Sequence, residues 1–170
     1  MTFTTLKDLQ IEKEHVNENF PKEIVIQSNA IAEVATYLLS RKWTNILIVG
    51  DDNTIDAAGH KVNKSLINAE FNSHITMVEH DHLGDVIADE ASIIQVMIDG
   101  KRTKAEVMLA VGGGTIHDIV RFTSHMIGIP FISVPTAPQL MVLALWEHRS
   151  FSEELRKRIK QRDQMPYLLI

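Results

Sequence analysis

The stretch "VGGGTIHD", residues 111–118, decides the fold of this chain. An apolar run of strand length, 106–112, enters the glycines, and a helical pattern follows at 115–128. A glycine loop between a strand and a helix lets the backbone approach a phosphate closely, and the first N–H groups and the dipole of the helix favour an anion. We therefore interpret the stretch as a pyrophosphate-binding loop. A tight glycine turn without a ligand is the alternative, because the spacing matches neither G-x-G-x-x-G nor a P-loop with its lysine.

On both sides of this loop, apolar runs of strand length alternate with helical patterns. The expected strands are 23–27, 45–50, 73–80, 106–112 and 130–136, and the expected helices are 28–42, 54–69, 85–99 and 115–128. Nearly continuous apolar strands that alternate with helices predict an α/β fold, a Rossmann-like parallel sheet with helices on both faces.

Two further expectations follow from this pattern. Ligands of such sheets bind beyond the carboxyl ends of the strands, which directs attention to the loops at 50–54, 79–85, 112–118 and 135–139. In the helix predicted over 85–99, the spacing of the apolar residues predicts a buried face that contains Ile87, Ala91, Ile94 and Ile98.

Length and composition exclude several classes of protein. The chain has 170 residues, a net charge of -5 and no cysteine. A single domain is expected, nucleic acid is disfavoured as a partner, and disulfides and cysteine-based zinc sites are excluded. The N-terminal residues lack the apolar region of a signal peptide, and no apolar run is long enough to span a membrane. We expect a cytoplasmic location.

Asp51 follows the expected strand 45–50 and is the candidate for binding a ribose. A carboxylate at this position can accept hydrogen bonds from an adenosine ribose diol, and its charge would repel a 2′-phosphate, which favours NAD over NADP. The alternatives are that Asp51 only caps the next helix, or that Asp52 contacts the ribose instead.

The histidines at 80, 82 and 117 could be metal ligands or a catalytic base, and the sequence argues against both roles. Glu79, His80, Asp81 and His82 are metal-ligand types, but consecutive residues in a strand or loop point in different directions, which disfavours a metal site. His117 stands at a helix start, where we expect it to line a pocket or to contribute its backbone N–H rather than to act as a base.

Three stretches carry a family resemblance: "ILIVGDDNT…AAG", "AVGGGTIHDIVRF" and "GIPFISVPTAP". In this order and spacing they resemble the sn-glycerol-1-phosphate dehydrogenase family, its bacterial branch in particular. That family belongs to the dehydroquinate-synthase-like, iron-containing alcohol dehydrogenase superfamily. The resemblance covers roughly residues 20 to 138. It implies a Rossmann-like N-terminal domain, a helical metal-binding C-terminal domain, and NAD(P)-linked interconversion of dihydroxyacetone phosphate and glycerol 1-phosphate.

The resemblance also implies roles for individual positions. Asp51 would meet the adenosine ribose, the loop and first helical turn the pyrophosphate, and the end of the last strand the nicotinamide side. The implied cofactor-binding residues are Asp51, Gly113, Gly114, Thr115, Ile116, His117, Asp118, Thr136 and Ala137. In the family a divalent metal (zinc, nickel or iron) polarises the substrate carbonyl. The substrate is a small-molecule phosphate, and a homo-oligomer is left open.

The sequence departs from the family at residue 139. After "PTAP" the family pattern is Ser, any residue, Asp-Gly-Phe, but the chain has "QLMVL" at 139–143. Residues 139–170 hold six Lys and Arg against four acids, a balance of +2 that leaves -7 for residues 1–138. We therefore expect a NAD(P)-binding domain over 1–138 and a basic segment over 139–170 that does not belong to the family.

One hypothesis for this segment is a frameshift or truncation. With allowed codons, a one-base shift turns "QLMVL" into Ser-Val-Asp-Gly-Phe, and the alternative is a native amphipathic terminal helix. The family's metal ligands, one Asp and two His, belong to the C-terminal domain, which we expect to be absent here. We predict no catalytic or metal-binding residue and no turnover by this chain alone.

Two other functions are left open. One is a nucleotide-binding fragment without catalysis. The other is a related glycerol dehydrogenase or dehydroquinate synthase, which the absence of a Lys or Ser soon after the glycines disfavours.

Overall fold

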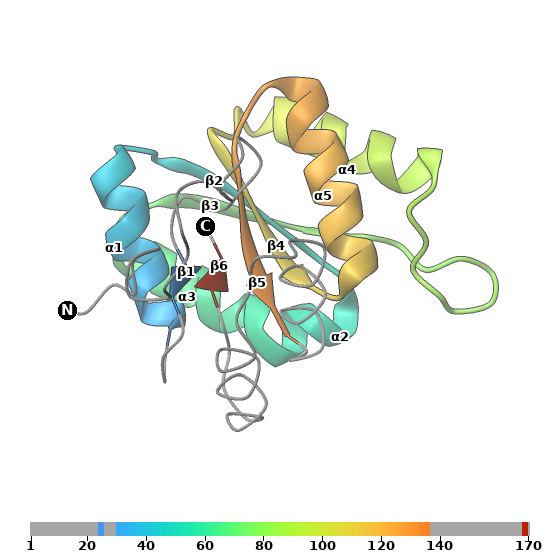
Figure 1. Cartoon of the computed structure of the whole chain (residues 1–170), viewed down its shortest axis with the longest axis horizontal. Coiled ribbons are helices and arrows are strands. Elements are labelled where there is room, and N and C mark those ends of the chain that lie inside the picture. The colour runs from blue at the N-terminus through green and yellow to red at the C-terminus, as the bar shows by residue number, and fades with distance from the viewer. Residues whose placement is uncertain (1–23, 26–29, 137–167, 170) are drawn as a thin grey trace, which may run out of the picture.

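The computed structural model describes residues 24–25, 30–136 and 168–169, which form one sheet with helices on both sides (Figure 1). The strands are β1 (Ile24–Val25), β2 (Asn45–Gly50), β3 (Asn72–Met77), β4 (Val107–Gly112), β5 (Phe131–Pro135) and β6 (Leu168–Leu169). Their order is β1-β6-β5-β4-β2-β3. The four strands β2 to β5 pair in parallel, and β6 pairs antiparallel with β5 and β1.

The helices alternate with the strands β1 to β5 along the chain. They are α1 (Ile31–Arg41), α2 (Asp52–Thr54), a π-helical turn (Ile55–Gly59), α3 (His60–Asn68), α4 (Glu90–Arg102) and α5 (Gly114–Ile127). Among the described residues, no helix has both the length and the apolar content that crossing a membrane requires.

Alternate side chains of the central strands pack into two cores, one on each face of the sheet. Ile46 and Ile48 of β2 pack with residues of α1 and α3, whereas Leu47 and Val49 pack with residues of α4 and α5. All four are fully buried. This alternation is the period of two that a strand imposes, and it confirms the α/β sheet with helices on both faces.

The glycine loop and its flanking elements form as the sequence predicts. The strand expected at 106–112 is β4, and the helix expected at 115–128 is α5, which ends at Gly128 with a φ of 76°. The helix expected at 54–69 is interrupted by the π-helical turn. The Ile55 side chain covers Gly59 there, at 2.5 Å from where a Cβ would stand.

The predicted buried face of the helix after β3 is wrong. The residues of α4 that are buried are Ser92, Val96 and Gly100, whereas Ile94 and Ile98 are exposed. Gly100 explains the difference, because a Cβ there would lie 2.8 Å from Met108 Cε of β4. Small residues let α4 approach the sheet closely, and this requirement overrides the apolar spacing. Ile87, also exposed, precedes the helix.

Candidate functional site

The order of the parallel strands places a switch point between β2 and β4. From β2 the chain moves outward to β3, then crosses back to β4 on the opposite side of β2. The strands β2 and β4 are neighbours and run in parallel, and Val49 of β2 lies opposite Ala110 of β4. In sheets of this kind, ligands bind in the crevice at the carboxyl ends of such a strand pair. The loops after Gly50 and Gly112 therefore line the candidate site.

Two glycines at this edge are required by packing alone. A Cβ on Gly50 would lie 2.7 Å from the backbone oxygen of Val111. A Cβ on Gly112 would lie 3.0 Å from Cγ1 of Ile116 and 3.2 Å from the hydroxyl of Thr54. All three distances are shorter than ordinary van der Waals contacts. These two glycines hold the loops together and say nothing about a ligand.

Gly113 has no such structural reason. Its φ of -83° and ψ of -176° are extended values that any residue adopts. A Cβ on Gly113 would have no atom within 4 Å. Neither the backbone nor the packing of the described residues demands a glycine here. Among the described residues, the position that a Cβ of Gly113 would take, next to the start of α5, is open.

The first turn of α5 presents free donors to that space. Its N-cap, Gly113, has no side chain to accept from it, and the first hydrogen bond of the helix is donated by the N–H of His117. In the described part of the chain, no acceptor is found for the N–H groups of Gly114, Thr115 and Ile116. In contrast, α2 and α4 begin with aspartate caps. N–H groups at the positive end of a helix, here 14 residues long, can bind an anion when no acceptor of the protein occupies them, so this end of α5 is a candidate anion site.

The His117 side chain fixes the orientation of this loop. Its Nδ1 lies 2.7 Å from the carbonyl oxygen of Gly113, which also accepts from the His117 N–H at 3.1 Å. Because a carbonyl can only accept, Nδ1 carries the proton. The peptide between Gly113 and Gly114 is planar and trans, so the N–H of Gly114 points away from the held carbonyl. By holding the Gly113 carbonyl, His117 therefore fixes the direction of the Gly114 N–H.

Burial keeps the His117 ring neutral. Desolvation lowers the pKa of the imidazole, although the hydrogen bond to Gly113 partly opposes the shift. With the proton on Nδ1, Nε2 is an acceptor, and this buried atom has no partner among the described residues. From the sequence we expected His117 either to line a pocket or to contribute its backbone N–H to the site. In the structure, the His117 N–H donates to the Gly113 carbonyl as the first hydrogen bond of α5. The imidazole also holds this carbonyl, a contact that the sequence did not predict.

The other residues of the predicted pyrophosphate group are arranged differently. Ile116 is buried in the core and can offer only its N–H. Asp118 lies on the exposed side of α5, where its carboxylate pairs with Arg121 at 2.6 Å. Contact of these residues with a cofactor stays a prediction.

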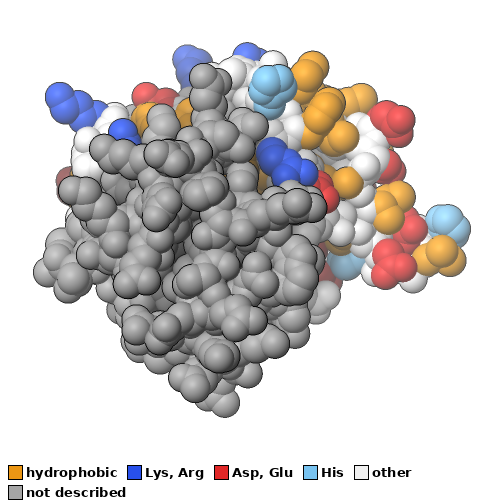
Figure 2. Space-filling view, in the orientation of Figure 1, with side chains coloured by type: hydrophobic (Ala, Val, Ile, Leu, Met, Phe, Trp, Pro, Cys, Tyr) orange, Lys and Arg blue, Asp and Glu red, His pale blue; other side chains and the backbone are white. Residues whose placement is uncertain are grey.

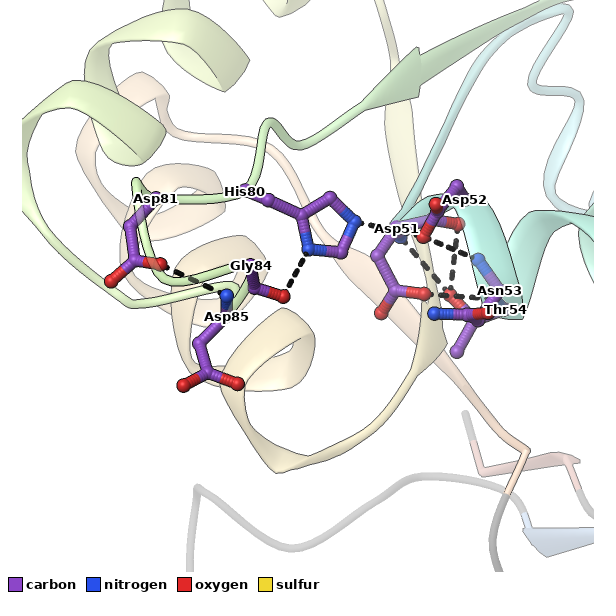
Figure 3. Close-up of polar contacts among 8 residues, drawn as sticks. All are labelled: Asp51, Asp52, Asn53, Thr54, His80, Asp81, Gly84 and Asp85. Carbon is purple, nitrogen blue, oxygen red and sulfur yellow. Dashed lines mark hydrogen bonds and ion pairs between the residues drawn. The ribbon is translucent and has the colours of Figure 1, made fainter.

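Asp51 caps the helix that follows β2. Its Oδ1 accepts from the N–H of Thr54 at 2.8 Å, and the hydroxyl of Thr54 accepts from the N–H of Asp51 at 3.0 Å (Figure 3). The capping alternative is therefore observed. It leaves Oδ2, which accepts nothing from the described residues, so the carboxylate retains capacity for a hydroxyl donor.

Asp52, the rival candidate, is engaged with the loop after β3. Its Oδ1 lies 2.8 Å from Nε2 of His80, and Nδ1 of His80 lies 2.8 Å from the carbonyl oxygen of Gly84 (Figure 3). Both ring nitrogens face acceptors, so the ring fits its doubly protonated form. The hydrogen bond to Asp52 is the main cause that raises the pKa of His80, and the same bond lowers the pKa of Asp52.

A sequence profile of iron-containing alcohol dehydrogenases matches residues 25–140. The chain belongs to the iron-containing alcohol dehydrogenase family. It is 41% identical over 119 residues to the glycerol-1-phosphate dehydrogenase of Geobacillus stearothermophilus, and 40% identical over 119 residues to that of Bacillus subtilis; both relatives are named as NAD(P)+ enzymes. These matches cover 70% of this chain and 29% and 30% of the two relatives. The resemblance expected from the sequence is confirmed, and the chain spans less than a third of these relatives.

The fold agrees with solved structures of the family. An iron-containing alcohol dehydrogenase from Corynebacterium glutamicum superposes with a TM-score of 0.58 and 11% identity, over 72% of this chain and 32% of the other. At that identity the likeness establishes the fold alone.

The family name implies a metal, and the described residues do not supply a centre for it. Within residues 24–25, 30–136 and 168–169, no group of three or more His, Cys, Asp or Glu side chains is placed to hold a metal ion. The residues of "EHDH" are instead held in a turn: Asp81 Oδ1 accepts from the N–H groups of Leu83 and Asp85 at 2.8 and 2.9 Å (Figure 3 draws the second of these).

The predicted nicotinamide end lies at the same edge of the sheet. Thr136 follows β5, and its N–H donates to the carbonyl oxygen of Gly112 at 3.3 Å. Thr136 is thus placed beside the glycine loop, and its contact with a cofactor stays a prediction. Ala137 lies outside the described residues.

Proposed function

We propose that this chain binds the pyrophosphate of NAD or NADP at the start of α5. Two features of Gly113 together support the proposal. Neither its backbone conformation nor its packing against described residues requires a glycine, and the three N–H groups that follow it have no acceptor among those residues. The fit to the cofactor rests on these groups, because a pyrophosphate needs donors and close backbone approach. When bound, the nicotinamide ring would give or take the hydride of the reaction.

The ribose end of the cofactor would lie against Asp51. Its Oδ2 is available, whereas Asp52 is paired with His80. A carboxylate accepts well from ribose hydroxyls and repels a 2′-phosphate, which favours NAD over NADP. The positive charge of His80 partly offsets the negative charges of Asp51 and Asp52, so we expect NAD to bind more tightly than NADP but NADP still to bind.

The proposal for the whole protein comes from its relatives. They are named glycerol-1-phosphate dehydrogenases, and the corresponding reaction interconverts dihydroxyacetone phosphate and glycerol 1-phosphate. This chain would be the nucleotide-binding part of such an enzyme. Because its described residues offer no metal-binding group, we propose that the chain alone binds cofactor without turnover.

Calorimetric titration of the 170-residue chain with NADH, in parallel with a turnover assay, tests the proposal. Gly113→Ala is expected to weaken binding about tenfold or more, because a Cβ would occupy the space in front of the donors. Gly128→Ala is the matched control. Its φ of 76° makes alanine costly by about 1 kcal/mol in stability, but it closes the opposite end of α5.

The control should lose stability and keep its affinity for NADH. Equal affinity of wild type and Gly113→Ala for NADH, or no binding by either, would overturn the proposed site. Oxidation of NADH with dihydroxyacetone phosphate by this chain alone would overturn the expected lack of turnover.

A further inference from the structure

One histidine joins the loop after β3, residues 79–85, to the start of α2. Nε2 of His80 lies 2.8 Å from Oδ1 of Asp52, and Nδ1 lies 2.8 Å from the carbonyl oxygen of Gly84 (Figure 3). These two hydrogen bonds hold the imidazole from opposite sides, between the turn of the loop and the acidic residues that follow β2. A charge on this ring therefore has a fixed place at the carboxyl edge of the sheet.

The charged groups around His80 are acidic, apart from one other histidine. Asp51 and Asp52 act on the ring from the start of α2. Its own loop adds four further titratable residues, which are Glu79, Asp81, His82 and Asp85. Figure 2 shows acidic and histidine side chains together on this projecting loop, at the right-hand edge of the molecule. Among the ion pairs of the described residues, none joins a Lys or Arg to Asp51 or Asp52, so His80 is the basic side chain that offsets these two carboxylates.

Protonation of His80 changes the net charge of this group by one unit. With Asp51 and Asp52 ionised, a charged imidazole leaves a net charge of -1 and a neutral imidazole leaves -2. The hydrogen bonds to Asp52 and Gly84 raise the pKa of His80, so the charged form extends above the ordinary histidine range. A 2′-phosphate carries a charge of about -1.5 to -2 near neutral pH, whereas a ribose hydroxyl is neutral. The charge on His80 therefore affects NADP much more than NAD.

We propose that His80 sets how strictly the ribose end distinguishes NAD from NADP, by placing a titratable positive charge beside Asp51 and Asp52. This inference rests on the proposed cofactor site, with the pyrophosphate at α5 and the ribose against Asp51. Below the pKa of His80, the imidazolium offsets one carboxylate and NADP is accepted. Above that pKa, both carboxylates repel the 2′-phosphate, so the preference for NAD is stronger. At about 7 Å in a wet surface site, one unit of charge changes the affinity for a phosphate dianion about tenfold.

Calorimetric titrations of the 170-residue chain with NAD and with NADP, between about pH 6 and about pH 9, test the inference. In wild type, the Kd for NADP relative to that for NAD should rise with pH. The second ionisation of the 2′-phosphate, at about pH 6, contributes to this rise. His80→Gln has no charge at any pH and measures that contribution. It should disfavour NADP about tenfold more than wild type at the low end of the range and match wild type at the high end. His82→Gln, exposed on the same loop, is the matched control and should keep the wild-type profile.

A second variant separates the charge of His80 from its structural role. His80→Arg supplies a positive charge that does not titrate in this range, so its ratio should follow only the phosphate ionisation. Raised salt should reduce the difference between wild type and His80→Gln, because the side chains of His80 and Asp52 are 32% and 60% exposed.

Three results would overturn the inference. The same pH profile of the ratio in wild type and His80→Gln, with both cofactors bound, would overturn it and leave the proposed cofactor site standing. Equal weakening of NAD and NADP by His80→Gln at every pH would also overturn it, because the role of His80 would then be structural. If neither cofactor binds to wild type, the proposed cofactor site and this inference fail together.

Discussion

The adjacent glycines 112 and 113 in the loop after β4 should differ in how much stability they lose when replaced by alanine. At Gly112, a Cβ would lie 3.0 Å from Cγ1 of Ile116 and 3.2 Å from the Thr54 hydroxyl. Overpacking of this kind costs about 2 kcal/mol of unfolding free energy, which lowers the melting temperature of a chain of this size by about 4–8 °C. At Gly50 the nearest atom is the Val111 backbone oxygen at 2.7 Å, which cannot rotate away, so we expect a loss of about 3 kcal/mol.

At Gly113, in contrast, a Cβ would meet nothing within 4 Å. Alanine is a poorer N-cap than glycine but stiffens the unfolded chain, and these effects offset each other to within about 0.5 kcal/mol. Urea unfolding of Gly50→Ala, Gly112→Ala and Gly113→Ala, followed by circular dichroism, measures all three. If Gly113→Ala proves as destabilising as Gly112→Ala, then packing requires the glycine at 113, and its presence does not indicate a ligand site.

Three further predictions concern the polar groups around this edge. His117→Ala should weaken NADH binding about tenfold, because the held carbonyl of Gly113 is released; unchanged affinity in an equilibrium titration would contradict the buttressing role. Asp51→Asn keeps a capping side chain but removes the charge, so the affinity for NADP relative to NAD should rise about tenfold, and a ratio that stays constant would exclude Asp51 from the ribose site. Because the pKa of His80 is raised, its bond to Asp52 stabilises the folded loop fully at pH values below the ordinary histidine pKa, and this stabilisation is lost as the pH rises through the raised pKa. Across that pH range, hydrogen exchange of the Asp85 amide should accelerate more than base catalysis alone explains. A His80→Ala variant should lack this additional acceleration.

The parallel strands β2 to β5 and the glycine loop could be predicted because their signals are local, whereas β6 was not predicted. β2 is predicted to the residue, since a buried parallel strand is a continuous apolar run that ends at a glycine. The loop before α5 likewise follows from its glycines and from the helical pattern beyond them. The family resemblance rests on the same stretches.

What could not be predicted depends on distant contacts. The buried side of α4 is set by Gly100 against Met108, a contact between two elements that the helical spacing does not contain. The pair between His80 and Asp52 joins residues 28 positions apart. Even within α5, the bond of His117 to Gly113 required the actual side-chain geometry, because the sequence offered its N–H as an equally good donor.

The proposed pyrophosphate site consists of the N–H groups at the start of α5. A titration of the 15N-labelled chain with NAD, followed by amide chemical shifts, tests it most directly. We expect the largest shifts at Gly114, Thr115 and Ile116, with smaller ones at Asp51, and we expect Gly113→Ala to abolish them. Saturable binding whose largest shifts fall elsewhere, with these three amides unmoved, would contradict it.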